Sequence, residues 1–144
     1  MTVSLKPIVI FFVVVFIIYI PTMIFQWYVD LPWIDIPLHL MGGAWVALLF
    51  FRLFGDLFFE KLYEHKYEAA RVLILAVAFS VLIGVFWEFF EYLLTQYTPI
   101  EFQGSLTDTM GDLLMDILGS LAMAYFILFY LFPKKRQVVS QLEG

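Results

Sequence analysis

Residues 7–27 read PIVIFFVVVFIIYIPTMIFQW and contain no charged side chain. A helix that crosses the roughly 30 Å hydrocarbon core of a bilayer needs about 20 apolar residues, so this segment predicts a membrane-spanning helix. No small-residue cleavage site follows it, and we interpret it as a retained helix rather than a signal peptide. Three further segments have similar length and hydropathy: 36–54, 70–94 and 109–132. The sequence thus predicts an all-α polytopic membrane protein, a four-helix transmembrane bundle that forms a single membrane domain over residues 1–144.

The composition of the chain agrees with this fold class. Of its 144 residues, 63% are hydrophobic and only 15% are charged, against roughly 25% in an ordinary soluble domain. These values exclude a soluble enzyme and an intrinsically disordered chain. The net charge of −5 argues against a nucleic-acid partner, which requires a basic surface. The absence of cysteine excludes disulfides, thiolate metal sites and a cysteine nucleophile.

The positions of the basic residues predict how the chain is oriented in the membrane. Basic residues concentrate on the cytoplasmic side of membrane proteins. Here they lie at the start of the first span, around the loop between the second and third spans, and after the fourth span, whereas loops 28–35 and 95–108 contain none. Both termini are therefore expected in the cytoplasm, and those two loops outside. The eight residues are Lys6, Arg52, Lys61, Lys66, Arg71, Lys134, Lys135 and Arg136.

Small residues predict where the helices approach one another closely. Glycine and serine at a helix interface allow two backbones to come together in a membrane. The second and fourth spans carry such residues at Gly42, Gly43, Gly111, Gly119 and Ser120. We interpret all five as packing residues.

Ionisable side chains inside the predicted spans are the main functional signal. An ionised acid near the bilayer centre costs up to about 3 kcal/mol. The outer halves of the spans contain no lysine or arginine that could pair with these groups, so protons, water or a bound cation must compensate their charge. The five side chains are His39, Glu88, Glu91, Asp112 and Asp116.

Their spacing predicts that they meet in one pocket. Residues three or four apart share a helix face, and at about 1.5 Å per residue the groups on three helices reach matched depths below the outer surface. We therefore expect a polar pocket that opens to the outside and extends about 10 Å into the bundle. The sets that share a face are Asp35 with His39, Glu88 with Glu91, and Asp108 with Asp112 and Asp116.

One imidazole and several carboxylates without sulfur form a hard, oxygen-rich ligand set. Such a set suits Mg²⁺, Mn²⁺, Ca²⁺ or Fe, and Zn²⁺ if the histidine binds. We predict that one or two divalent metals bind here, with Glu88 or Glu91 as a general base. Two alternatives stay open: Asp35 and Asp108 could cap helices, and the buried acids could form a protonated, hydrogen-bonded cluster. The predicted metal ligands are Asp35, His39, Glu88, Glu91, Asp108, Asp112 and Asp116.

The function that follows is metal-dependent chemistry on a lipid or cell-envelope substrate, as in a membrane hydrolase that approaches its substrate from the outer face. A proton- or cation-coupled transporter is the alternative, in which four short spans would act as a homo-dimer. His39 and the four acids inside the spans all lie in the outer half, which argues against a transport path. A non-catalytic envelope or antibiotic-resistance module is the third hypothesis.

Three segments resemble a known group of proteins: IDIPLHLMGGAW (34–45), FWEFFEYL (86–93) and QGSLTDTMGDLLMDILGSL (103–121). Their order and spacing resemble the YjdF-like bacterial inner-membrane proteins and, more distantly, the VanZ-like family associated with glycopeptide resistance. The resemblance covers about residues 30–125 and implies a multi-pass protein of a prokaryotic plasma membrane. Where VanZ-like proteins usually have glutamine and asparagine, this chain has Glu91 and Asp116, which favours a metal over a neutral hydrogen-bond network.

Overall fold

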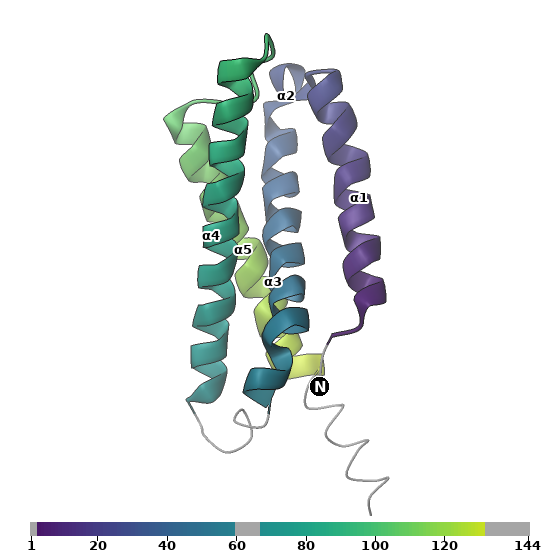
Figure 1. Ribbon diagram of the computed structural model, residues 1–144, viewed down its shortest axis with the longest axis vertical. Helices are drawn as coiled ribbons and strands as arrows, with labels where there is room; N and C mark the ends of the chain where they lie inside the picture. The colour runs from purple at the N-terminus through teal and green to yellow at the C-terminus, as the bar shows by residue number, and fades with distance from the viewer. Residues whose placement is uncertain (1–2, 60–66, 132–144) are drawn as a thin grey trace, which may run out of the picture.

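A computed structural model describes residues 3–59 and 67–131, without the side chains of residues 28, 29, 32 and 59. It contains four long helices, each long and apolar enough to cross a membrane, which confirms the predicted fold class (Figure 1). In chain order the elements are α1 (Leu5–Ile24), α2 (Trp27–Asp30), the 3₁₀ turn η1 (Pro32–Ile34), α3 (Asp35–Phe59), α4 (Glu68–Tyr97), α5 (Leu106–Phe126) and the π-helical turn η3 (Ile127–Leu131).

The helices differ from the predicted spans mainly at their ends. α3 and α4 both extend past the predicted limits, to Phe59 and Tyr97. α1 ends at Ile24, and the chain then turns through Gln26, whose φ is 52°. Residues 25–34 form two short turns that bring the chain to the start of α3.

Helix α3 occupies the centre of the bundle, and the other three long helices pack against it (Figure 1). Its closest partner is α5, and α4 packs on both. α1 packs mainly on α3, and its contacts with α4 are sparse. The bundle core therefore consists of α3, α4 and α5, with α1 added at one side.

The core differs in character along its length. Towards the basic end it is apolar, with Phe51, Val72, Ala76 and Ile127 almost fully buried. The inward face of α4 follows a four-residue period of small residues, Ala76, Ser80 and Gly84, and then reaches Glu88. The same helix face that packs tightly in one half of the molecule thus presents a carboxylate in the other half.

Two glycines bring the backbones of α3 and α5 into direct contact. A Cβ at Gly43 would overlap the backbone of Asp116, and a Cβ at Gly119 would overlap the carbonyl oxygen of Leu40. A Cβ at Gly111 would meet nothing within 4 Å, so the expectation of close packing is wrong there. The contact between α3 and α5 fixes the positions of the acidic residues that α5 carries near it.

Gly119→Ala is expected to destabilise the protein by about 1–3 kcal/mol, because the added methyl group overpacks the α3–α5 contact. Gly111→Ala, a matched change on the same helix, is expected to be neutral or to stabilise by up to about 1 kcal/mol, since alanine is the better helix former. Thermal unfolding in detergent, followed by circular dichroism, measures both. Equal stability of the two variants would contradict the described packing of α3 on α5.

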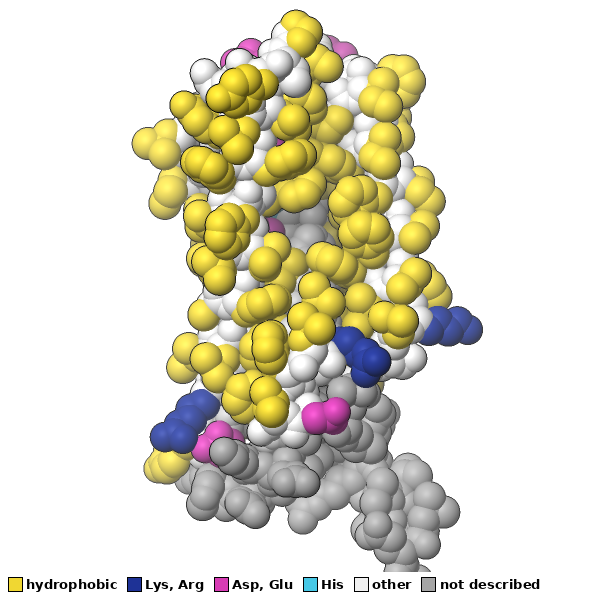
Figure 2. Space-filling model, in the orientation of Figure 1, with side chains coloured by type: hydrophobic (Ala, Val, Ile, Leu, Met, Phe, Trp, Pro, Cys, Tyr) yellow, Lys and Arg dark blue, Asp and Glu magenta, His cyan; other side chains and the backbone are white. Residues whose placement is uncertain are grey.

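The described basic side chains gather at one end of the bundle. Lysine and arginine side chains lie at the lower end in Figure 2, and most of the visible surface between the two ends is hydrophobic. The described basic residues are Lys6, Arg52 and Arg71, and Arg71 pairs with Glu68 of its own helix at 2.9 Å. The cytoplasmic placement of this end stays a prediction from the positive-inside rule.

Candidate metal centre

The imidazole of His39 is the centre of the acidic cluster, and the first turn of α3 positions it. Asp35 is the first residue of that helix, so His39 lies one turn further along on the same face. Pro37 fits between them because the first turn of a helix does not need its N–H groups. His39 Nε2 lies 3.6 Å from Asp35 Oδ1 and 4.0 Å from Asp112 Oδ1.

Three ligand atoms from these residues converge on one point. One atom each of Asp35, His39 and Asp112 lies within 4.8 Å of the others. Bonds in zinc and calcium sites measure roughly 2.0–2.6 Å, so ligand atoms within 4.8 Å of one another are compatible with a shared ion. His39 and Asp112 are buried and Asp35 is partly exposed. The three residues therefore form a ligand set that is open on one side.

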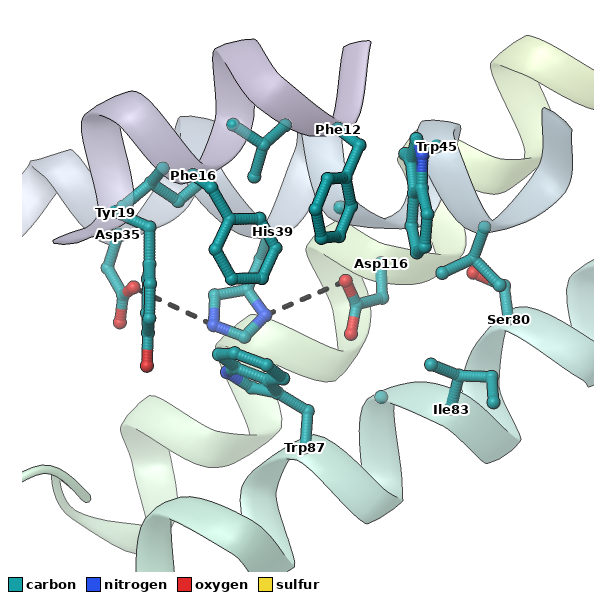
Figure 3. A pocket seen from close by; sticks show the side chains of 15 residues that line it. Phe12, Phe16, Tyr19, Asp35, His39, Trp45, Ser80, Ile83, Trp87 and Asp116 are labelled. Atoms are coloured by element: carbon teal, nitrogen blue, oxygen red, sulfur yellow. Dashed lines mark ion pairs between the residues drawn. The ribbon is translucent and has the colours of Figure 1, made fainter. Parts of the chain in front are cut away.

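Asp116 faces the opposite nitrogen of the same ring. Its Oδ1 lies 3.6 Å from His39 Nδ1, and Figure 3 shows the imidazole between Asp35 on one side and Asp116 on the other. The sequence predicted Asp116 as a direct ligand alongside the others, but the structure brings it to the far side of the histidine. In many metal sites a carboxylate in this position fixes the orientation of the ligating imidazole.

The two glutamates of α4 have different surroundings although both are buried. Glu91 Oε1 accepts a hydrogen bond from Trp87 Nε1 at 2.9 Å and lies 3.5 Å from the hydroxyl of Tyr19, which donates to it. Glu88 Oε1 has no hydrogen-bond partner among the described residues. The Glu88 carboxyl group has a side-chain hydrogen bond with Thr109 and interacts electrostatically with His39, so it belongs to the same cluster.

Asp108 lies at the mouth of the cluster. It is exposed, and its backbone N–H donates to Ser105 Oγ at 3.3 Å. Ser105 is thus the N-cap of α5, and the alternative that Asp108 caps this helix is wrong. The side chain of Asp108 instead lines a cavity together with Asp35 and Asp112.

Two cavities meet at the cluster. One, of about 330 Å³, lies between α3 and α5 and is lined by Asp35, Ser105, Asp108 and Asp112 among others; we call it the polar vestibule. The other, of about 220 Å³, lies between α1, α3 and α4, and we call it the aromatic cavity. Asp35 lines both cavities. The aromatic cavity is lined by Phe12, Val15, Phe16, Tyr19, Asp35, Leu38, His39, Gly42, Trp45, Val46, Ser80, Ile83, Gly84, Trp87 and Asp116.

The contribution of α1 to the site could not be predicted from spacing along the chain. Its Tyr19 reaches Glu91 across 72 residues of sequence, and its aromatic residues line the cavity beside His39 (Figure 3). Aromatic side chains at positions 12, 16 and 19, spaced four and three residues apart, were the available signal, but in a span this apolar they do not distinguish an inward face from a lipid-facing one.

No lysine or arginine in the described part of the chain lies in this cluster. The three described basic residues are far away in sequence and lie at the other end of the bundle (Figure 2). Buried charges must be paired, protonated or bound to a metal. The carboxylates are therefore compensated by His39, by protons or by a bound cation.

Residues 1–132 match the model of a family described as "Predicted membrane protein (DUF2238)". The chain belongs to this family. As a member of DUF2238 it is a multi-pass membrane protein, and the match includes all four long helices and every residue of the cluster. No curated protein and no solved structure shows significant similarity to the chain.

Proposed function

We propose that this DUF2238 protein binds a divalent metal through Asp35, His39 and Asp112, and uses it for chemistry on a lipid or lipid-linked substrate. The observation that carries the proposal is the convergence of three ligand atoms within 4.8 Å. The unpartnered oxygen of Glu88 beside them is a second, independent sign of a missing ligand.

The form of the ligand set favours a catalytic site over a structural one. Structural zinc sites are closed by four protein ligands, whereas catalytic sites keep a position open for water or substrate. Here three protein groups converge, and the polar vestibule borders two of them, Asp35 and Asp112. One nitrogen and two carboxylates suit Zn²⁺, Mn²⁺ or Fe²⁺ better than Ca²⁺, which prefers six to eight oxygens.

The remaining acids have separate roles in this proposal. Asp116 holds the imidazole through Nδ1. Glu88, with a free carboxylate oxygen, accepts the proton of an attacking water as a general base. Glu91 is held by Trp87 and Tyr19, so it positions α1 against α4 rather than taking part in proton transfer. Asp108, at the mouth, attracts the cation.

The orientation and the cellular location are part of the same proposal. The basic end faces the cytoplasm by the positive-inside rule, which places the cluster on the outer side of a prokaryotic plasma membrane. The resemblance of residues 30–125 to the YjdF-like and VanZ-like proteins supports a role in the cell envelope. A bound metal supplies an activated water or a polarised phosphoryl or carbonyl oxygen, as hydrolysis of a lipid head group requires.

Metal analysis of the purified protein tests the proposal. Elemental mass spectrometry is expected to find close to one Zn²⁺, Mn²⁺ or Fe²⁺ per chain after incubation with each ion and desalting. Asp112→Asn is expected to reduce this content at least tenfold. Asp30→Asn, a matched change at an exposed residue outside the cluster, should leave it unchanged. Wild-type protein that retains no metal under these conditions would contradict the proposal and favour a protonated acid cluster.

A further inference from the structure

An unbroken series of aromatic rings lines one wall of the aromatic cavity. Ring centroids lie 5.1 Å apart between Trp45 and Phe12, 4.3 Å between Phe12 and Phe16, 5.9 Å between Phe16 and Tyr19, and 5.1 Å between Tyr19 and Trp87. The series joins α3 to α4 by way of α1. His39 and Asp116 lie beside it, as Figure 3 shows.

Hydrogen bonds hold α1 at both ends of this series, with the open space between them. Near one end Trp45 Nε1 donates to the carbonyl oxygen of Ile8 at 3.0 Å. Near the other end Tyr19 donates to Glu91. The inward side chain of Val15, midway between these two links, borders the cavity. α1 is therefore kept at a distance from α4 over the middle of its length instead of closing onto it.

The cavity has the character of a site for hydrocarbon. Except for Asp35, His39, Ser80 and Asp116, its lining consists of aromatic and aliphatic side chains, two glycines and Tyr19. Phe12 remains 38% exposed, so the space communicates with the surface that faces lipid. Figure 2 shows this apolar face hollowed near its middle, with an acidic side chain visible inside. Pockets that enclose a whole drug-sized ligand measure about 300–1,000 Å³, so about 220 Å³ accommodates a segment of a ligand.

We propose that the aromatic cavity binds one hydrocarbon chain of a membrane lipid, which enters sideways between α1 and α4 and brings its polar head to His39 and Asp35. The role of the head group rests on the proposed function, whereas binding of the hydrocarbon chain is inferred from the cavity alone. Because Asp35 also lines the polar vestibule, lipid and water reach the cluster from opposite sides.

Photolabelling tests this site directly. The full chain is reconstituted into nanodiscs that contain a phosphatidylcholine with a diazirine in the middle of one acyl chain. After irradiation, labelled residues are mapped by mass spectrometry. Labels are expected on inward residues of the cavity, Val15, Ile83 and Trp87, as well as on lipid-facing residues of α1 such as Val14. Labelling confined to the lipid-facing residues would overturn the proposal.

A matched pair of variants tests whether photolabelling depends on the open volume of the aromatic cavity. Val15→Phe fills the cavity and is expected to reduce labelling of Ile83 and Trp87 at least fivefold. Val14→Phe is the same change on the neighbouring, 42% exposed residue and is expected to leave it unchanged. Equal labelling in both variants would overturn the proposal. If Val15→Phe does not fold, the labelled positions in the wild-type protein test the proposal by themselves.

The metal is varied separately so that the two proposals can fail independently. Chelation with EDTA, and Asp112→Asn, are expected to leave the acyl-chain labels on Val15 and Ile83 within twofold of the wild-type value. Inward labels in a wild-type protein that retains none of the added metals would contradict the metal site while supporting the cavity. Metal binding without labels on the inward residues would support the metal site and contradict the lipid cavity.

Discussion

Binding of a divalent metal is expected to raise the free energy of unfolding by about 2.7 kcal/mol when the free metal concentration is 100 times its Kd. His39→Ala is expected to abolish the whole of this gain. The imidazole supplies the nitrogen ligand, and without it Asp35 and Asp112 lose the group at 3.6 and 4.0 Å that they share. Thermal unfolding in detergent, with and without Zn²⁺ or Mn²⁺, measures the effect.

Asp116→Asn separates ligation from positioning in the same experiment. An outer-shell carboxylate that orients a ligating histidine typically contributes 10–100-fold to metal affinity. We therefore expect Asp116→Asn to weaken binding by about this factor while the metal still stabilises the protein at higher concentration. Complete loss of binding would make Asp116 a direct ligand, as the sequence pattern first suggested. Asp30→Asn serves as the control with unchanged affinity.

The second large effect concerns Glu88. In metal-free protein Glu88→Met is expected to increase the free energy of unfolding by about 1–3 kcal/mol, because it removes a buried polar atom without a partner. The hydrogen bond between Glu88 and Thr109 is also lost, but Thr109 is partly exposed and can bond to water instead. Glu91→Met, one turn further along the same face, removes the acceptor of Trp87 and Tyr19. It is expected to destabilise by about 1–3 kcal/mol, since the part-buried indole N–H of Trp87 loses its acceptor at 2.9 Å and the hydrogen bond that links Tyr19 of α1 to α4 is broken.

Chemical denaturation in the presence of EDTA compares these two variants with the wild type. A gain in stability from Glu88→Met together with a loss from Glu91→Met would support a structural role for Glu91. It would also support a functional role for Glu88 that lowers the stability of the protein. Destabilisation by Glu88→Met as large as that by Glu91→Met would show that the Glu88 carboxylate contributes to the fold, and would remove it as the proposed base.

The spans and the meeting of the acids were predictable because both follow from local periodicity. Long apolar segments leave a helix as the only way to satisfy the backbone in lipid. The spacing of Asp35 and His39, and of Asp112 and Asp116, fixes which groups share a face of one helix. Matched depth from the outer surface then brings the faces of different helices together, as the His39–Asp112 distance of 4.0 Å shows.

The division of roles within the cluster was not predictable, because it depends on how each helix is rotated about its axis. Asp112 and Asp116 lie one turn apart and are chemically identical, yet they face different nitrogens of His39. That difference arises where Gly43 and Gly119 let α5 approach α3, a contact between residues more than 70 positions apart. The partners of Glu91 depend likewise on α1, whose sequence contains no ionisable group near Tyr19.

Every group that we assign to the metal lies on α3, α4 or α5, while α1 contributes the aromatic wall and is hydrogen-bonded to the rest of the bundle through Trp45 and Tyr19. The molecule thus has a tightly packed part, in which the backbones of α3 and α5 touch, and a wall on α1 that is held mainly by side-chain contacts. Exchange of a bound lipid requires movement only of that wall. The residence time of the lipid would then be set by how often Tyr19 and Trp45 release α1, and the metal ligands would keep their geometry between one substrate and the next.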